Sequence, residues 1–175
     1  MKRILVAVDL QKDFVDGALG TAEAVKIIPA AAEKIASFSG DMLFVTYDTH
    51  YENYMDTLEG KKLPVPHCIE GTEGHALNSK IAEALEKKEH TDIIKNTFGT
   101  FEIAKILKEK YAGEELEIEL IGLCTDICVA SNAIILRAQF PNSVIRVDSK
   151  CCAGVTPQSH ADALSTLSSC QIDIL

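Results

Sequence analysis

The chain has 175 residues, a length that suits one domain spanning residues 1–175 with a single sizeable core. Hydrophobic residues make up 47% of it, which excludes a disordered chain. The net charge of −9 argues against a nucleic-acid partner, because phosphate binding needs clustered Lys and Arg. No apolar run approaches the ~20 residues of a membrane span. We therefore expect no membrane partner and, without a signal-peptide pattern, a cytoplasmic protein.

Apolar runs and helical spacings alternate along the first half of the chain. Residues 4–8 are a continuous apolar run, typical of a parallel strand buried on both faces. Apolar residues at helical spacing predict a helix over 22–38, and a second buried strand is predicted over 42–46. Residues 51–74 are irregular, with Gly, Pro and charged side chains. Loops of that length inside a compact domain are usually functional or disordered.

The second half of the chain continues the alternation. Helices are predicted at 77–87, 101–111, 126–139 and 159–169, and strands at 91–94, 117–121 and 143–147, with an edge strand at 171–175. This order predicts an α/β fold: a three-layer, doubly wound sandwich with a mostly parallel central sheet and helices on both faces. No Gly-rich phosphate loop follows the first strand, so a dinucleotide site is not expected.

Ionisable side chains follow four of the predicted strands. They are Asp9, the pair Asp48 and His50, Lys95, and Cys128. Each alone has an ordinary explanation: Asp9 could cap a turn, and Lys95 could be a solvated charge. Because ligands in open α/β sheets bind beyond the carboxyl ends of the strands, the four together predict an active site at that edge.

Cys128 is the candidate nucleophile. It follows a tight turn after the apolar run 118–123 and lies at the start of a predicted helix. Most free cysteines are buried and do no chemistry. At a helix N-terminus, however, the backbone N–H groups and the helix dipole favour the thiolate and could hold an oxyanion. In a cytoplasmic protein the six cysteines are expected to be reduced thiols: Cys68, Cys124, Cys128, Cys151, Cys152 and Cys170.

Three segments carry a resemblance to a known family. Residues 8–14 resemble the D-x-Q-x-D-F opening of the isochorismatase-like cysteine hydrolases, residues 95–101 their K-x-x-[FY]-[SG]-x-F segment, and residues 122–129 their nucleophile turn. The resemblance implies a catalytic triad of Asp9, Lys95 and Cys128. It also implies an oxyanion hole of the backbone N–H groups of Cys124 and Cys128, with a cis peptide bond between Leu123 and Cys124.

The chemistry of these side chains supports amide hydrolysis. An amide carbonyl is a poor electrophile, so covalent attack by Cys128 helps near neutral pH. Asp9 would act as general base and pass the thiol proton to the leaving ammonia. Lys95 would favour both the thiolate and the ionised Asp9 through Coulomb attraction.

A further set of residues resembles the nicotinamidase branch of the family. Asp48-Thr49-His50 and the later His67-Cys68-Ile69-Glu70-Gly71-Thr72-Glu73-Gly74 match its D-x-H and H-C-[IV]-x-G-T-x-G patterns. The resemblance implies a divalent metal held by Asp48, His50, His67 and one further side chain. Glu59 matches that position best and Glu52 less well. Such ligands suit Zn²⁺, the ion we expect, or Mn²⁺ or Fe²⁺. The ordinary alternative is a loop of solvated acids with a capping histidine.

Aromatic side chains are expected to shape the pocket. Phe14 and Phe98 could flank a flat ring, although either could instead be a core residue. Leu123 and Cys124 are the other expected substrate contacts. The chain has no tryptophan, whereas many nicotinamidases place one against the pyridine ring, and Tyr54 is the candidate substitute.

The leading hypothesis is a nicotinamidase that converts nicotinamide to nicotinic acid and ammonia in NAD salvage. Its small-molecule amide substrate would be the main partner. A metal-free hydrolase of another amide or a ureido compound in the same family, and a non-catalytic binding protein on this fold, are the alternatives. A zinc site of Cys124, Cys128, Cys151 and Cys152 lacks the usual C-x₂-C spacing. Family members are commonly oligomeric, and the sequence leaves monomer and homo-oligomer open.

Overall fold

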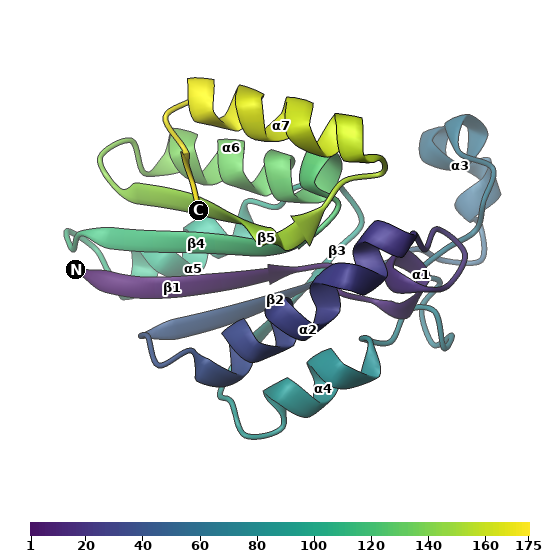
Figure 1. Ribbon diagram of the computed structural model, residues 1–175, viewed down its shortest axis with the longest axis horizontal. Coiled ribbons are helices and arrows are strands. Elements are labelled where there is room, and N and C mark those ends of the chain that lie inside the picture. Colours follow the sequence, from purple (N-terminus) through teal and green to yellow (C-terminus); the bar gives the residue numbers. More distant parts are fainter.

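A six-stranded parallel sheet forms the centre of the computed structural model, which describes residues 1–175 (Figure 1). The strands lie in the order β3-β2-β1-β4-β5-β6, and every neighbouring pair is parallel. Their bounds are β1 Lys2–Val8, β2 Met42–Asp48, β3 Thr91–Lys95, β4 Leu116–Leu123, β5 Val144–Ala153 and β6 Asp173–Ile174. The predicted α/β class is confirmed, with a wholly parallel sheet instead of a mostly parallel one.

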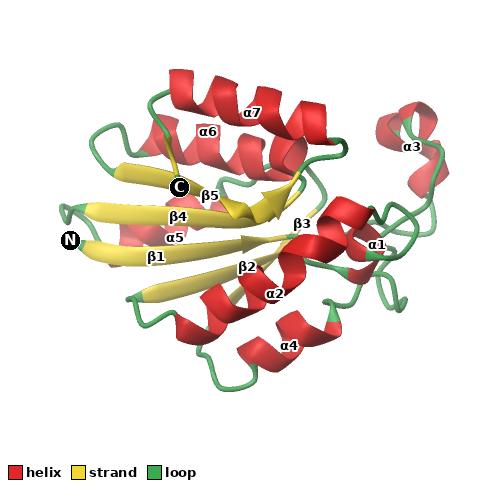
Figure 2. Cartoon of the chain, viewed as in Figure 1, coloured by secondary structure: helices red, strands yellow, loops and turns green.

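Helices cover both faces of the sheet, which gives three layers (Figure 2). Their bounds are α1 Lys12–Val15, α2 Ala22–Ser37, α3 Leu58–Lys62, α4 Ser79–Leu85, α5 Glu102–Lys110, α6 Ala130–Gln139 and α7 Pro157–Ser169. α2 and α4 lie on one face, and α5, α6 and α7 lie on the other. No helix combines the length and apolar character that crossing a membrane requires.

The alternation of side chains along β1 separates two cores. Ile4, Val6 and Val8 face the core under α5, α6 and α7. Leu5 and Ala7 face the core under α2 and α4. Successive strand residues point to opposite faces, so a strand buried on both sides needs the continuous apolar run that the sequence carries here.

Some elements differ from the predictions. The irregular segment 51–74 contains a 3₁₀ turn, η1 (Tyr54–Asp56), and the short helix α3. The predicted helix 126–139 begins with a π-helical turn, η2 (Thr125–Val129), before α6. β5 runs six residues beyond the predicted end at residue 147, through a register shift against β4.

The register of the sheet places the ends of four strands beside one another. Val8 of β1 pairs with Thr46 of β2 and with Gly122 of β4, and Asp48 pairs with Lys95 of β3. Gly122 has a φ of +119°, and a Cβ there would lie 2.0 Å from the carbonyl oxygen of Val8. Glycine is therefore required where β4 approaches β1, just before the predicted nucleophile turn.

Candidate active site

The structure brings Asp9, Lys95 and Cys128 together at the carboxyl edge of the sheet. Asp9 follows β1, Lys95 ends β3, and Cys128 lies in η2 after β4. The ammonium nitrogen of Lys95 lies 2.6 Å from Asp9 Oδ2 and 3.6 Å from Cys128 Sγ. None of the three residues is more than 5% exposed. The cation therefore lies between a carboxylate and a thiol and is shielded from water.

Thr46 fixes the orientation of Asp9. Its hydroxyl donates a 2.6 Å hydrogen bond to Asp9 Oδ1, and the backbone N–H of Asp9 donates to Thr46 in return. Asp9 has a φ of +47°, in the left-handed region that few residues other than glycine adopt. Sequence reasoning missed Thr46. The available signal was the one polar residue in the predicted strand 42–46, which is otherwise apolar.

Burial changes the electrostatics that the sequence predicted for Cys128. Removal from water raises the pKa of the thiol well above its usual range, and the charge of Asp9 raises it further, while Lys95 opposes both. Burial also raises the pKa of Asp9, against the lowering effect of Lys95. This direction is opposite to the lowering expected from a helix N-terminus, and it fits the expected transfer of the thiol proton to Asp9. The structure favours a neutral thiol whose proton must be removed by a neighbour.

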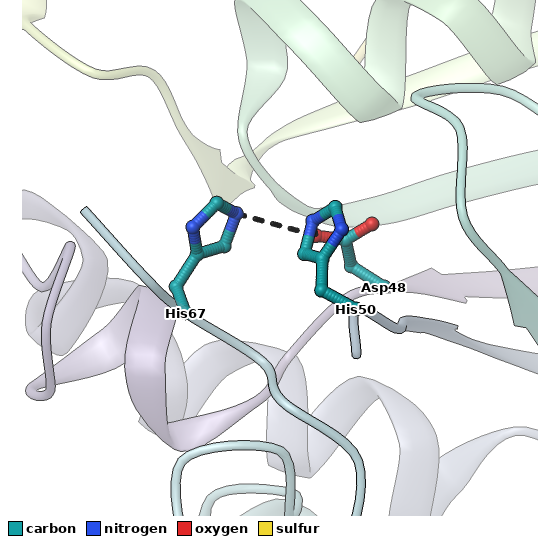
Figure 3. A group of neighbouring side chains, drawn as sticks. All are labelled: Asp48, His50 and His67. Atoms are coloured by element: carbon teal, nitrogen blue, oxygen red, sulfur yellow. Dashed lines mark ion pairs between the residues drawn. The ribbon is translucent and has the colours of Figure 1, made fainter. Parts of the chain in front are cut away.

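Asp48, His50 and His67 form a second group beside the first (Figure 3). Asp48 Oδ2 lies 3.0 Å from His50 Nε2 and 3.5 Å from His67 Nε2. Burial alone would raise the pKa of Asp48, but the two neighbouring imidazoles and the charge of Lys95 hold it well below its usual range. An ionised carboxylate thus faces two imidazole nitrogens.

The donor atoms of this group fit a divalent metal ion. The three ligand atoms lie within 4.8 Å of one another, and the buried Nε2 of His50 has no hydrogen-bond partner. His67 Nδ1 lies 2.8 Å from the carbonyl oxygen of Val65. A proton on that nitrogen leaves Nε2 with a free lone pair, as in most metal-binding histidines. One carboxylate and two imidazoles suit first-row divalent ions.

Two carboxylates were candidates for the fourth ligand, and the structure separates them. Glu59 Oε1, on α3, lies 3.6 Å from His50 Nε2 and 3.7 Å from His67 Nε2. Glu52 is exposed and lines a separate surface hollow. Glu59 is therefore the better-placed residue. The helix that carries it was not predicted.

Tyr54 does not lie where the sequence analysis expected a ring-stacking substitute for tryptophan. Its ring packs edge-on against His50 and His67, with centroid distances of 4.7 and 5.1 Å. Its hydroxyl donates to the carbonyl oxygen of Leu63, and the residue is 1% exposed. Tyr54 therefore supports the two imidazoles from behind and is absent from the cavity wall.

Gln11 and Asp13 hold the segments that carry the histidines, and sequence reasoning gave neither a role. Gln11 Nε2 donates to the carbonyl oxygens of Asp48 and His75, and its Oε1 accepts the N–H of Asp48 at 2.8 Å. Asp13 Oδ2 accepts the N–H of Cys68 at 2.7 Å. The signal was present in the polar positions of the segment 8–14.

A cavity of about 590 Å³ opens between the two groups. Its wall includes the four predicted substrate contacts, Phe14, Phe98, Leu123 and Cys124, together with Cys128, Asp48, Glu59 and His67. The peptide bond between Leu123 and Cys124 is cis. Burial raises the pKa of the Cys124 thiol to about 12, so that side chain is a neutral part of the wall. Cys151 and Cys152 are buried in the two cores, and all six cysteines are free thiols.

Comparison with known proteins agrees with this geometry. A family model described as the isochorismatase domain matches residues 3–175. This chain belongs to the isochorismatase family. The isochorismatase family protein PncA of Bacillus subtilis (strain 168) is 32% identical to it over 177 residues, covering 94% of this chain and 93% of that protein.

Solved structures of the isochorismatase family share the fold over the whole chain. The nicotinamidase/pyrazinamidase PncA from Bacillus subtilis matches with a TM-score of 0.86 and 26% identity, covering 99% of each chain. The pyrazinamidase of Pyrococcus horikoshii, solved in complex with zinc, matches with a TM-score of 0.82 and 25% identity, covering 100% of this chain and 99% of that one. The protein is thus a hydrolase of the nicotinamidase branch, as the motifs predicted.

Proposed function

We propose that this protein is a metal-assisted cysteine amidohydrolase that converts nicotinamide to nicotinic acid and ammonia. One observation carries the proposal: Lys95 bridges Asp9 and Cys128 at 2.6 and 3.6 Å, and Cys128 lies on the wall of a cavity that Asp48 and His67 also line. A nucleophile, a base and a metal-ligand group around one cavity suit attack on an amide held by a nearby ring. The nicotinamidases and pyrazinamidases among its structural neighbours support this substrate class.

The first half of the reaction forms a thioester. The thiol proton of Cys128 moves to Asp9, and the sulfur attacks the carboxamide carbon. Lys95 stabilises the anions that exist while the proton is in transit. When the tetrahedral intermediate collapses, the C–N bond breaks, and the nitrogen leaves as ammonia with the proton from Asp9.

The second half releases the acid. A water molecule gives a proton to Asp9 and attacks the thioester carbon. The carbon–sulfur bond then breaks, nicotinic acid leaves, and the proton returns to Cys128. In both halves the backbone N–H groups of Cys124 and Cys128 are the proposed hydrogen-bond donors to the oxyanion.

Asp48, His50 and His67, with Glu59 at 3.6–3.7 Å from the two histidines, would hold the metal ion. We propose Zn²⁺, since this ligand set suits it and a zinc complex exists for the Pyrococcus horikoshii neighbour. The ion would supply a Lewis acid able to bind the pyridine nitrogen and orient the carboxamide toward Cys128. Phe14 and Phe98 would flank the ring.

The test is ammonia release from nicotinamide by the purified protein, with and without a chelator, beside Cys128→Ala. The proposal expects release that is lost in the variant and in the chelated enzyme, and that returns when Zn²⁺ is added back. Release that survives chelation would remove the metal from the mechanism and favour the metal-free family alternative. No release from metal-loaded protein would overturn nicotinamide as the substrate.

A further inference from the structure

Asn132 is a buried polar residue that the proposed mechanism does not use. It lies on α6, four residues after Cys128, and is 1% exposed. Its Nδ2 donates to the carbonyl oxygen of Cys128 at 2.8 Å and to that of Phe98 at 3.3 Å. Its Oδ1 accepts the backbone N–H of Thr100 at 3.0 Å. One side chain therefore bonds the nucleophile turn to the loop that follows β3.

The loop approaches α6 closely enough for this bridge to fix its position. A Cβ on Gly99 would lie 2.6 Å from Ile135 Cδ1 and 3.1 Å from Ser131 Cβ, so the loop backbone lies directly on the helix. Phe98 is 48% exposed, and its ring is part of the cavity wall. Because packing covers only half of that side chain, backbone hydrogen bonds must account for much of its placement.

We propose that Asn132 is a positioning residue that sets the separation between Cys128 and the Phe98 wall across the cavity. The proposal rests on the proposed function only in taking Cys128 as the nucleophile. A buried amide whose donor and acceptor groups are bonded to fixed backbone has one favourable orientation, so it transmits the position of α6 to the loop. The same loop begins directly after Lys95, and the bridge therefore spans two segments of the triad.

Two substitutions of matched shape separate the two ends of the bridge. In Asn132→Thr the hydroxyl can return to the carbonyl oxygen four residues earlier, which is that of Cys128, but it is too short to reach the loop. In Asn132→Val both ends are lost. Both variants introduce a β-branched side chain, and the two side chains have nearly equal volume, so the helix propensities of the two variants match.

The experiment measures KM and kcat for nicotinamide and the rate of Cys128 alkylation by iodoacetamide, read at that cysteine by mass spectrometry. We expect both variants to raise KM about tenfold, because the Phe98 wall is released in each. Only Asn132→Val should also slow Cys128 alkylation, by about fivefold, since only that variant frees the nucleophile turn. Equal alkylation rates for the two variants, or an unchanged KM, would overturn the proposal.

Ile35→Val controls for a general loss of stability. Ile35 is fully buried on α2, under the opposite face of the sheet from α6, so trimming it lowers the melting temperature without touching either segment. If this control changes KM and alkylation as Asn132→Val does, the role of Asn132 is merely structural. If the wild-type protein releases no ammonia, the proposed function fails. The alkylation difference between Thr and Val still decides the role of Asn132.

Discussion

The two halves of the candidate site are held in different ways. Asp9, Lys95 and Cys128 lie at strand ends or in the turn that follows one, and the sheet register brings them together. His67 and Glu59 instead come from the long segment after β2, outside the sheet. Side chains of the segment after β1 bond to that region: Gln11 donates to the carbonyl oxygen of His75, and Asp13 accepts the N–H of Cys68. Backbone pairing within the sheet thus assembles the nucleophile, whereas the metal-ligand group needs in addition a segment outside the sheet, held by side chains and by backbone bonds between His50 and residues 68 and 70.

The largest expected effect follows from removing the nucleophile. Cys128→Ala should lower kcat for nicotinamide by at least about 10⁴-fold, because no thioester can form. It should leave Zn²⁺ affinity, measured by competition with a chelating dye, unchanged. If Cys128→Ala also loses the metal, the triad and the metal-ligand group depend on each other and are not held independently.

The second expected effect concerns the cation in the triad. Burial raises the pKa of Asp9, and the charge of Lys95 lowers it. The variant Lys95→Met should therefore raise the pKa of Asp9 further. Asp9 must be ionised to accept the thiol proton, so the acid limb of the kcat/KM profile should move to higher pH. The rate at the optimum should fall by about 10²-fold.

The control for that variant is Lys105→Met, which removes an exposed lysine paired with Glu102 on α5. This substitution should leave the pH profile in place. An acid limb that moves to lower pH in Lys95→Met would contradict the assigned roles of Lys95 and Asp9.

The third prediction tests the other half alone. His67→Ala should weaken Zn²⁺ binding by about 100-fold or more, since it removes one of three close ligands. Alkylation of Cys128 in the metal-free protein should proceed at the wild-type rate, because the polar contacts of His67 are with Asp48, Glu59 and Val65 and with no member of the triad. A slower alkylation would mean that the loop helps to hold the nucleophile.

The sequence predicted the residues at the strand ends more completely than those in the segment after β2, and the reason is physical. Parallel strands end at one edge, so residues such as Asp9 and Lys95 are placed by the strand pattern alone. A loop has no comparable period. The short helix that presents Glu59 and the packing of Tyr54 behind the histidines depend on contacts between distant residues, which the local pattern does not encode.

The sign of the Cys128 pKa shift was mispredicted for a related reason. A helix N-terminus lowers a thiol pKa where water is present, and that argument used only the local sequence. The depth of the site depends on the whole fold. At 4% exposure, the cost of burying a charge outweighs the lowering effect of Lys95 on the pKa of the thiol.

The smallest expected effect comes from Gln11, and it is the sharpest test of how the metal-ligand group is held. Gln11→Leu keeps a similar volume but leaves the N–H and C=O of Asp48 without their buried partner. Stability should fall by about 1–3 kcal/mol in urea unfolding, as for other unpaired buried polar groups. Zn²⁺ affinity should fall by about tenfold, in the range seen when groups behind metal ligands are removed.

The rate of Cys128 alkylation should not change in Gln11→Leu, since Gln11 bonds to no member of the triad. Gln158→Leu, an exposed position on α7, is the matched control and should change none of the three quantities. A stability loss with full Zn²⁺ affinity would mean that Asp48 is held by β2 alone. In that case only the ligands after β2, from His50 onward, would need side-chain bonds to hold them in place.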